Sequence, residues 1–122
     1  MRRNKVERYT GKERRKFPRL SANFVVSYKI KRIPDYYDLS QTKNVGQGGM
    51  LLTTNQKFAP GTQLILTVKF PFVPQRIEIE ATVVDSREVA KNMIYETRLS
   101  FIRLNKKFFQ ELGKFIEERL SD

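Results

Sequence analysis

Two short motifs carry residue types that bind phosphates and nucleobases: RKFPR at residues 15–19 and NVGQGG at residues 44–49. The guanidinium groups of Arg15 and Arg19 can each donate two parallel hydrogen bonds to a phosphate or to the O6/N7 edge of guanine. The Asn44 amide can donate and accept, so it can also meet a guanine edge. Neither motif contains catalytic chemistry of its own, and together they indicate a receptor for a small anionic nucleotide.

The glycines of the second motif are further candidate contacts, because glycine permits positive φ and a close approach of backbone N–H groups to a ligand. These candidates are Gly46, Gly48 and Gly49, and Arg14 adds a third guanidinium beside the first motif. Each motif alone is a weak signal, since a glycine cluster between strands is more often only a turn or a bulge. The order of the two motifs within a regular strand pattern is the stronger indication.

Catalytic and metal chemistry have little support in the composition. The chain contains no cysteine and no histidine, which removes disulfides, thiolates, the usual general base and the commonest metal ligand. The carboxylates do not follow a metal-binding or acid–base spacing; they include Asp35, Asp38, Glu78, Glu80 and Asp85. We therefore expect no enzymatic activity, no catalytic residue and no metal site.

Length and hydropathy predict one small intracellular domain. The 122 residues are enough for a single core, and no stretch approaches the roughly 18 apolar residues of a membrane span. The basic N-terminus is not followed by the apolar run of a signal peptide. The absence of cysteine fits a reducing compartment, so we expect a soluble, cytoplasmic protein.

The positive charge is concentrated at the N-terminus. Nine of the first 19 residues are Lys or Arg and two are Glu, so this segment carries seven of the eleven net positive charges. Residues 1–14 have almost no apolar side chains with which to offset the entropy of ordering. We expect a flexible basic arm over residues 1–14 and a folded domain over residues 15–122.

Hydrophobic periodicity predicts an all-β domain closed by a helix. Apolar and polar residues alternate over four long segments and two shorter ones, at 20–30, 64–70, 77–83, 93–101, about 37–45 and 50–54. After them Asn105 is a plausible N-cap for a helix with one apolar face, formed by Phe108, Leu112, Phe115, Ile116 and Leu120. Six antiparallel strands with one dry face favour a closed or nearly closed barrel, and the amphipathic helix can cover an open end.

On this framework, residues 15–120 resemble the PilZ domain, the bacterial receptor module for cyclic di-GMP. In that family R-x-x-x-R and D/N-x-S-x-x-G motifs form the nucleotide site on a six-stranded antiparallel barrel. Arg15 and Arg19 match the first motif, and Asn44 and Gly49 match the ends of the second. Gly46 stands where the family usually has a small hydroxyl residue, so we expect weaker binding. Gly46→Ser should then preserve or tighten binding if φ at this position is negative.

The resemblance implies a cyclic di-GMP-binding regulatory module that transmits binding to a protein partner and so controls motility, exopolysaccharide production or adhesion. It implies no cofactor besides this ligand. Two alternatives stay open: a basic barrel that binds RNA or single-stranded DNA, and a PilZ-like adaptor that no longer binds nucleotide. Nucleic acid is disfavoured as a partner because the excess charge lies in the arm, while the outward strand positions mix Ser, Thr, Gln, Glu and Lys.

Overall fold

The computed structural model describes residues 17–33 and 36–121, so the predicted arm over residues 1–14 lies outside the described residues. The described chain forms seven strands and one helix. In chain order they are β1 (Arg19–Ser21), β2 (Val25–Ile30), β3 (Asp38–Gly46), β4 (Gly49–Thr54), β5 (Gln63–Val68), β6 (Ile77–Ala90), β7 (Ile94–Ile102) and α1 (Lys106–Leu120).

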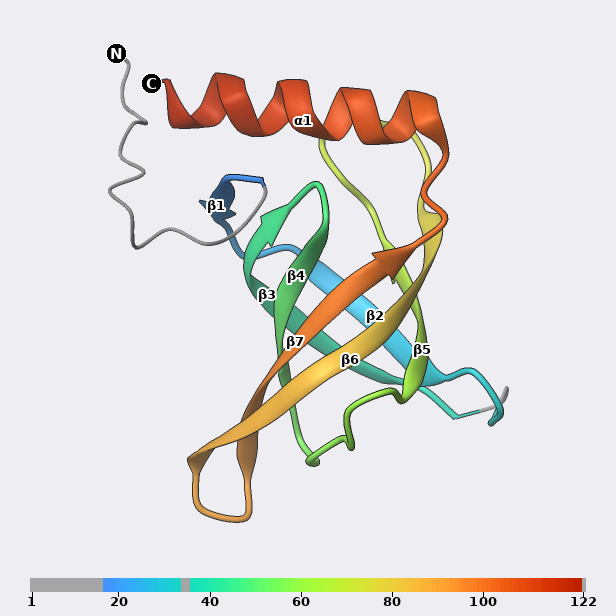
Figure 1. Cartoon of the computed structure of the whole chain (residues 1–122), viewed down its shortest axis with the longest axis vertical. Coiled ribbons are helices and arrows are strands. Elements are labelled where there is room, and N and C mark those ends of the chain that lie inside the picture. Colours follow the sequence, from blue (N-terminus) through green and yellow to red (C-terminus); the bar gives the residue numbers. More distant parts are fainter. Residues whose placement is uncertain (1–16, 34–35, 122) are drawn as a thin grey trace.

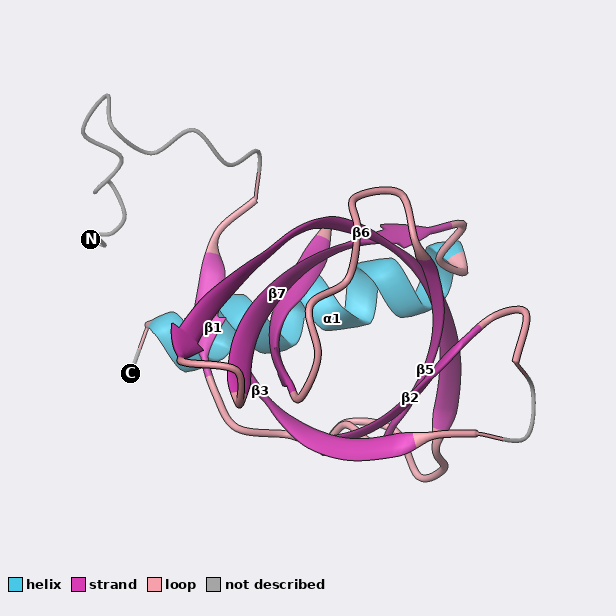
Figure 2. Cartoon of the chain, turned by 90° about the horizontal axis from the view of Figure 1, so that it is seen from below, coloured by secondary structure: helices cyan, strands magenta, loops and turns pink. Residues whose placement is uncertain are grey.

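Six of the strands close into an antiparallel barrel. The strand order is β3-β2-β5-β6-β7-β4, the pairing of β3 with β4 completes the ring, and β1 is an additional strand on β3. Figure 2 shows the ring of strands with α1 across one end. Closure leaves none of the six barrel strands with an unpaired edge, which confirms the predicted architecture.

The long strand predicted over residues 20–30 is in fact two strands, β1 and β2, which follow one another along the same edge of β3. The break is held by Thr42 of β3, whose side chain is completely buried. Its hydroxyl donates to the Ala22 carbonyl at 2.6 Å and accepts from the Phe24 N–H at 2.9 Å. Because one side chain satisfies backbone groups on both sides of the gap, the strand can bend there without losing hydrogen bonds.

The barrel interior follows the predicted alternation. The inward positions of the strands form one continuous core, in which the most completely buried large side chains are Phe70, Met50, Leu52, Leu64, Leu66 and Leu99. The segment predicted over residues 93–101 begins one residue too early, because Met93 lies in the turn before β7 and is 65% exposed. The β6–β7 hairpin is longer than predicted and projects from the end of the barrel opposite α1 (Figure 1).

Helix α1 begins where the sequence predicts. The Asn105 side-chain oxygen accepts from the Phe108 N–H at 3.1 Å, so this residue is the N-cap. The buried face consists of Leu112, Phe115 and Ile116, whereas Leu120, predicted on the same face, is 45% exposed. Neither α1 nor any other described segment is a helix long and apolar enough to cross a membrane.

Part of the underside of α1 packs on an aromatic cluster, which we call the aromatic seat. Phe108 and Phe115 of the helix contact aromatic rings of the barrel, with ring centroids between 5.0 and 6.1 Å apart. The barrel residues of the seat are Phe24, Phe70 and Phe72. This packing holds the helix over the end of the barrel, next to the turn that carries the second motif.

Candidate functional site

The pairing of β1 with β3 brings the two motifs together. In this register Arg19 lies opposite Gly46 and Ser21 lies opposite Asn44. The Arg19 Nη1 donates a hydrogen bond of 2.8 Å to the Asn44 Oδ1, although the two residues are 25 positions apart in the chain. Both side chains are half-buried, so two groups predicted from separate motifs form one partly enclosed pair. Arg14 and Arg15 lie outside the described residues.

Gly46 is the last residue of β3 and is buried beneath the chain that carries Arg19. A Cβ at this position would lie 2.9 Å from the Pro18 carbonyl oxygen and 3.0 Å from the Arg19 Cδ. The glycine is therefore required because the backbone of Pro18 and the stem of Arg19 cross directly over it. We interpret Gly46 as the position that leaves room for the Arg19 stem, and we call it the Arg19 seat. The motif comparison, which shows only that a hydroxyl is missing here, does not suggest this role.

The other two motif glycines also have close neighbours within the protein. A Cβ on Gly49 would lie 1.9 Å from the Leu99 carbonyl oxygen, because β4 and β7 approach very closely at this point. A Cβ on Gly48 would lie 3.3 Å from the Phe17 ring. Among the described glycines only Gly61 has a positive φ, of 91°. Gly48 and Gly49 do not use the positive φ that glycine permits, and the close approach at Gly49 is that of another strand.

Sequence reasoning missed two residues of this region, Gln47 and Phe17. The Gln47 Nε2 donates to the backbone carbonyl of Phe109 in α1 at 2.8 Å. The Phe17 ring meets the Phe109 ring edge to face, with centroids 5.5 Å apart. One signal was available in the sequence, since the glycine at 113 weakens the helix and so indicates a close packing partner.

Two of the carboxylates considered from the sequence, Glu80 and Asp85, form ion pairs at the protein surface. Glu80 lies 2.9 Å from the Lys31 ammonium, whose hydrogen bond and charge hold the pKa of this carboxyl below its usual range. Two hydrogen bonds from Arg98 lower the pKa of Asp85 in the same way. No group of acidic residues in the described part of the chain is arranged to hold a metal ion.

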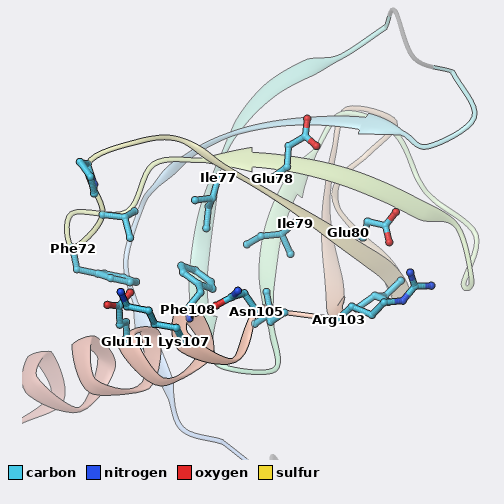
Figure 3. A pocket seen from close by; sticks show the side chains of 14 residues that line it. Phe72, Ile77, Glu78, Ile79, Glu80, Arg103, Asn105, Lys107, Phe108 and Glu111 are labelled. Carbon is cyan, nitrogen blue, oxygen red and sulfur yellow. Dashed lines mark hydrogen bonds between the residues drawn. The ribbon is translucent and has the colours of Figure 1, made fainter.

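A cavity of about 810 Å³ lies beside the first turn of α1, apart from the motif residues. Its floor is apolar, with Phe72, Ile77 and Ile79 among its residues, and its rim carries charges of both signs, including Glu78 and Arg103 (Figure 3). Arg19, Asn44 and the motif glycines do not line it. The predicted site is therefore a surface between β1 and the β3–β4 turn and is separate from this cavity.

Comparison with known proteins identifies the domain. A family model described as the PilZ domain matches residues 13–118. No curated protein sequence matches the chain. Several solved structures share the fold at 14–20% sequence identity.

The Bacillus subtilis inhibitor of motility MotI has a TM-score of 0.73 and 20% identity, over 88% of this chain and 52% of its own. The PilZ domain of YcgR from Escherichia coli, solved with c-di-GMP, has a TM-score of 0.64 and 16% identity, over 89% of this chain and 95% of its own. The c-di-GMP complex of MrkH from K. pneumonia has a TM-score of 0.68 and 14% identity, over 88% and 53%. The chain thus spans about half the length of MotI and MrkH.

Proposed function

We propose that this chain, which belongs to the PilZ domain family, is a receptor for cyclic di-GMP that passes ligand binding on to a protein partner. The observation that carries the proposal is the 2.8 Å hydrogen bond between Arg19 and Asn44, which joins the two family motifs across β1 and β3. The similarity of the fold to the PilZ domain of YcgR, solved with c-di-GMP, supports the same ligand.

The chemistry of the pair suits a guanine nucleotide with phosphodiester groups. Arg19, together with Arg15 of the first motif and the neighbouring Arg14, supplies charge-assisted donors for phosphate oxygens and for the O6/N7 edge of guanine. When the Asn44 oxygen accepts from Arg19, the amide nitrogen keeps two N–H donors for a nucleobase. Gly46 leaves room for the arginine stem, and backbone groups at Gly48 and Gly49 are further candidate contacts.

The proposed module acts in the cytoplasm and has no enzymatic step. Its output in motility, exopolysaccharide production or adhesion would come through a partner protein. The rival function, binding of RNA or single-stranded DNA, requires a continuous basic surface on the strands. Ion pairs on the outer barrel wall, such as Lys31 with Glu80 and Arg87 with Glu96, mix the charges there and favour the small ligand.

Titration calorimetry with cyclic di-GMP, with GMP and GTP as comparison ligands and at two salt concentrations, tests the proposal. A charge-assisted hydrogen bond contributes about 1.5–3 kcal/mol, so Arg19→Ala and Arg15→Ala should each weaken binding at least about tenfold. Arg87→Ala removes the same group from the far hairpin and serves as the matched control. Equal affinity for GMP, or unchanged binding in both motif variants, would overturn the proposal.

A further inference from the structure

The turn between β3 and β4 is fastened to α1 by a polar contact. The Gln47 side chain is half-buried and donates through Nε2 to the Phe109 carbonyl at 2.8 Å, across 62 positions of sequence. This carbonyl lies inside the helix, four residues before Gly113. A carbonyl oxygen has two lone pairs, so it can accept from Gln47 without giving up its hydrogen bond within the helix.

The Gln47 amide lies against the helix at Gly113, which has no side chain. A Cβ on Gly113 would lie 2.2 Å from the Gln47 Nε2 and 2.6 Å from its Cδ. Glycine in the middle of a helix is less favourable than alanine, so its position here needs a reason. The reason that the structure supplies is space for the amide, because any side chain at 113 would displace Gln47 from the Phe109 carbonyl.

Both motifs of the proposed ligand site reach the same helical turn. Gln47 directly follows Gly46, the Arg19 seat, and its side chain donates to the backbone carbonyl of Phe109. Phe17 comes two residues before Arg19 and contacts Phe109 through its ring. Figure 1 shows β1 and the tip of the β3–β4 hairpin beneath α1. The segments that carry Arg19 and Asn44, already paired through β1 and β3, therefore share contacts to one residue of the helix.

We propose that Gln47 is a positioning residue for the ligand site, and that docking of α1 through Phe109 and Gly113 is energetically coupled to ligand binding. The proposal rests on the proposed function for the identity of the ligand. Helix docking holds the turn in the arrangement in which Arg19 and Asn44 meet, so release of the contact lowers the fraction of binding-competent molecules. Coupling is reciprocal, so the ligand must stabilise the docked helix by the same factor.

The contact is tested first in the free protein with a double-mutant cycle between Gln47→Ala and Gly113→Ala. In the Gln47→Ala background the new methyl group meets no amide, and the gain in helix propensity should raise the melting temperature by roughly 3–5 °C. In the wild-type background the same substitution expels Gln47, so the melting temperature should stay unchanged or fall. Gln110→Ala, at an exposed helix position, should shift both backgrounds equally. Equal shifts for Gly113→Ala in both backgrounds would refute the contact.

Coupling to the ligand is tested by calorimetry with cyclic di-GMP below the melting temperature of every variant. Gln47→Ala, Gly113→Ala and the isosteric Gln47→Glu, which has no donor for the Phe109 carbonyl, should each weaken binding about three- to tenfold. The double variant should be no weaker than the worse single variant, because all of them release the same contact. In the wild type, ligand should slow amide hydrogen exchange across residues 109–116.

The outcomes separate this inference from the proposed function. If the wild type binds and the Gln47 variants bind equally well, with unchanged exchange in α1, the coupling is wrong while the receptor function stands. If the wild type itself does not bind cyclic di-GMP, the receptor function fails and the coupling fails with it. In that case a positive stability cycle would still establish Gln47 as a link between the β3–β4 turn and the helix.

Discussion

Helix α1 contacts the barrel through two regions of different chemistry. On the aromatic seat, Phe108 and Phe115 pack among barrel rings by apolar contacts, which are not directional and depend on the buried area. Over the β3–β4 turn, Gln47 and Phe109 are joined by one directed hydrogen bond that fits only because residue 113 has no side chain. We expect the first region to act mainly on the stability of docking and the second to fix the position of the turn that carries the proposed ligand motif.

This difference separates stability from ligand binding along one helix. A change in the aromatic seat should act mainly on the free energy of unfolding. A change at the polar contact, or at the Arg19 seat beside it, should act mainly on affinity. We make three predictions that test this separation and a fourth for an ion pair outside both regions, from the largest expected effect to the smallest.

The largest effect is expected for Phe115→Ala in the aromatic seat. Phe115 is 8% exposed and contacts Phe24 and Phe72, so its truncation leaves a cavity between the helix and the barrel. The free energy of unfolding should fall by about 3–5 kcal/mol, measured by urea denaturation. Tyr37→Ala removes an aromatic ring that is 61% exposed and should change it by less than about 0.5 kcal/mol. Similar losses in both variants would show that the seat does not carry the stability assigned to it.

Gly46→Ser should weaken cyclic di-GMP binding about tenfold, the opposite of what the motif alone predicts. The new Cβ would lie 2.9 Å from the Pro18 carbonyl, a backbone atom that cannot move aside cheaply, and 3.0 Å from the Arg19 stem. Loss of one charge-assisted contact of about 1.5–3 kcal/mol corresponds to that factor or more. In an Arg19→Ala background Gly46→Ser should reduce the affinity for cyclic di-GMP by a smaller factor, because the side chain that the serine would displace is already absent. Tighter binding by Gly46→Ser, measured by calorimetry, would refute the seat.

Asn105→Ala should cost about 1 kcal/mol of stability, because it removes the oxygen that caps the Phe108 N–H. The cap lies at the end of α1 next to the aromatic seat, one turn before Phe109, and its side chain bonds to the Phe108 N–H rather than to Gln47. Ligand affinity measured on the folded variant should therefore stay within about twofold of wild type. A loss of affinity as large as that of Gln47→Ala would mean that any weakening of the helix affects the site, and the two regions would not be distinct.

The smallest effect is expected from the ion pair of Asp85 and Arg98, which belongs to neither region of α1. Its hydrogen bonds lower the pKa of the Asp85 carboxyl in the folded state, so the unfolded chain takes up a proton at a higher pH. The pair therefore stabilises the protein above the usual Asp range, and that stability is lost as the pH falls through the folded-state pKa. The effect is small because the side chains are 57% and 46% exposed.

Urea denaturation between pH 7 and pH 3 should show a shallower loss of stability in Asp85→Asn than in the wild type. High salt should reduce the difference, because exposed charges are screened. Ligand affinity at neutral pH should be the same in both proteins. An identical pH dependence in the variant would mean that this pair contributes nothing measurable.

The sequence by itself determined the class of fold, because its evidence is local. Alternation of apolar residues, the turn residues and the Asn105 cap depend on neighbours a few positions away, and the six-stranded barrel with its helix was predicted from them. The contact of Thr42 with residues 22 and 24 could not be predicted from the local pattern. The alternation through residues 20–30 continues across the gap, and only a threonine from another strand reveals that the segment is two strands.

The motif residues were named from the sequence, but only the tertiary structure decided what the glycines do. Pairing of β1 with β3 sets Arg19 against Asn44 and places Pro18 over Gly46, and this register joins segments about 25 residues apart. Likewise Gly113 is an isolated weak point in a helix until Gln47 is placed against it. The physical reason is the same in both cases. The sequence shows that a glycine has no side chain, but only the folded structure shows which atoms occupy the space that a side chain would need.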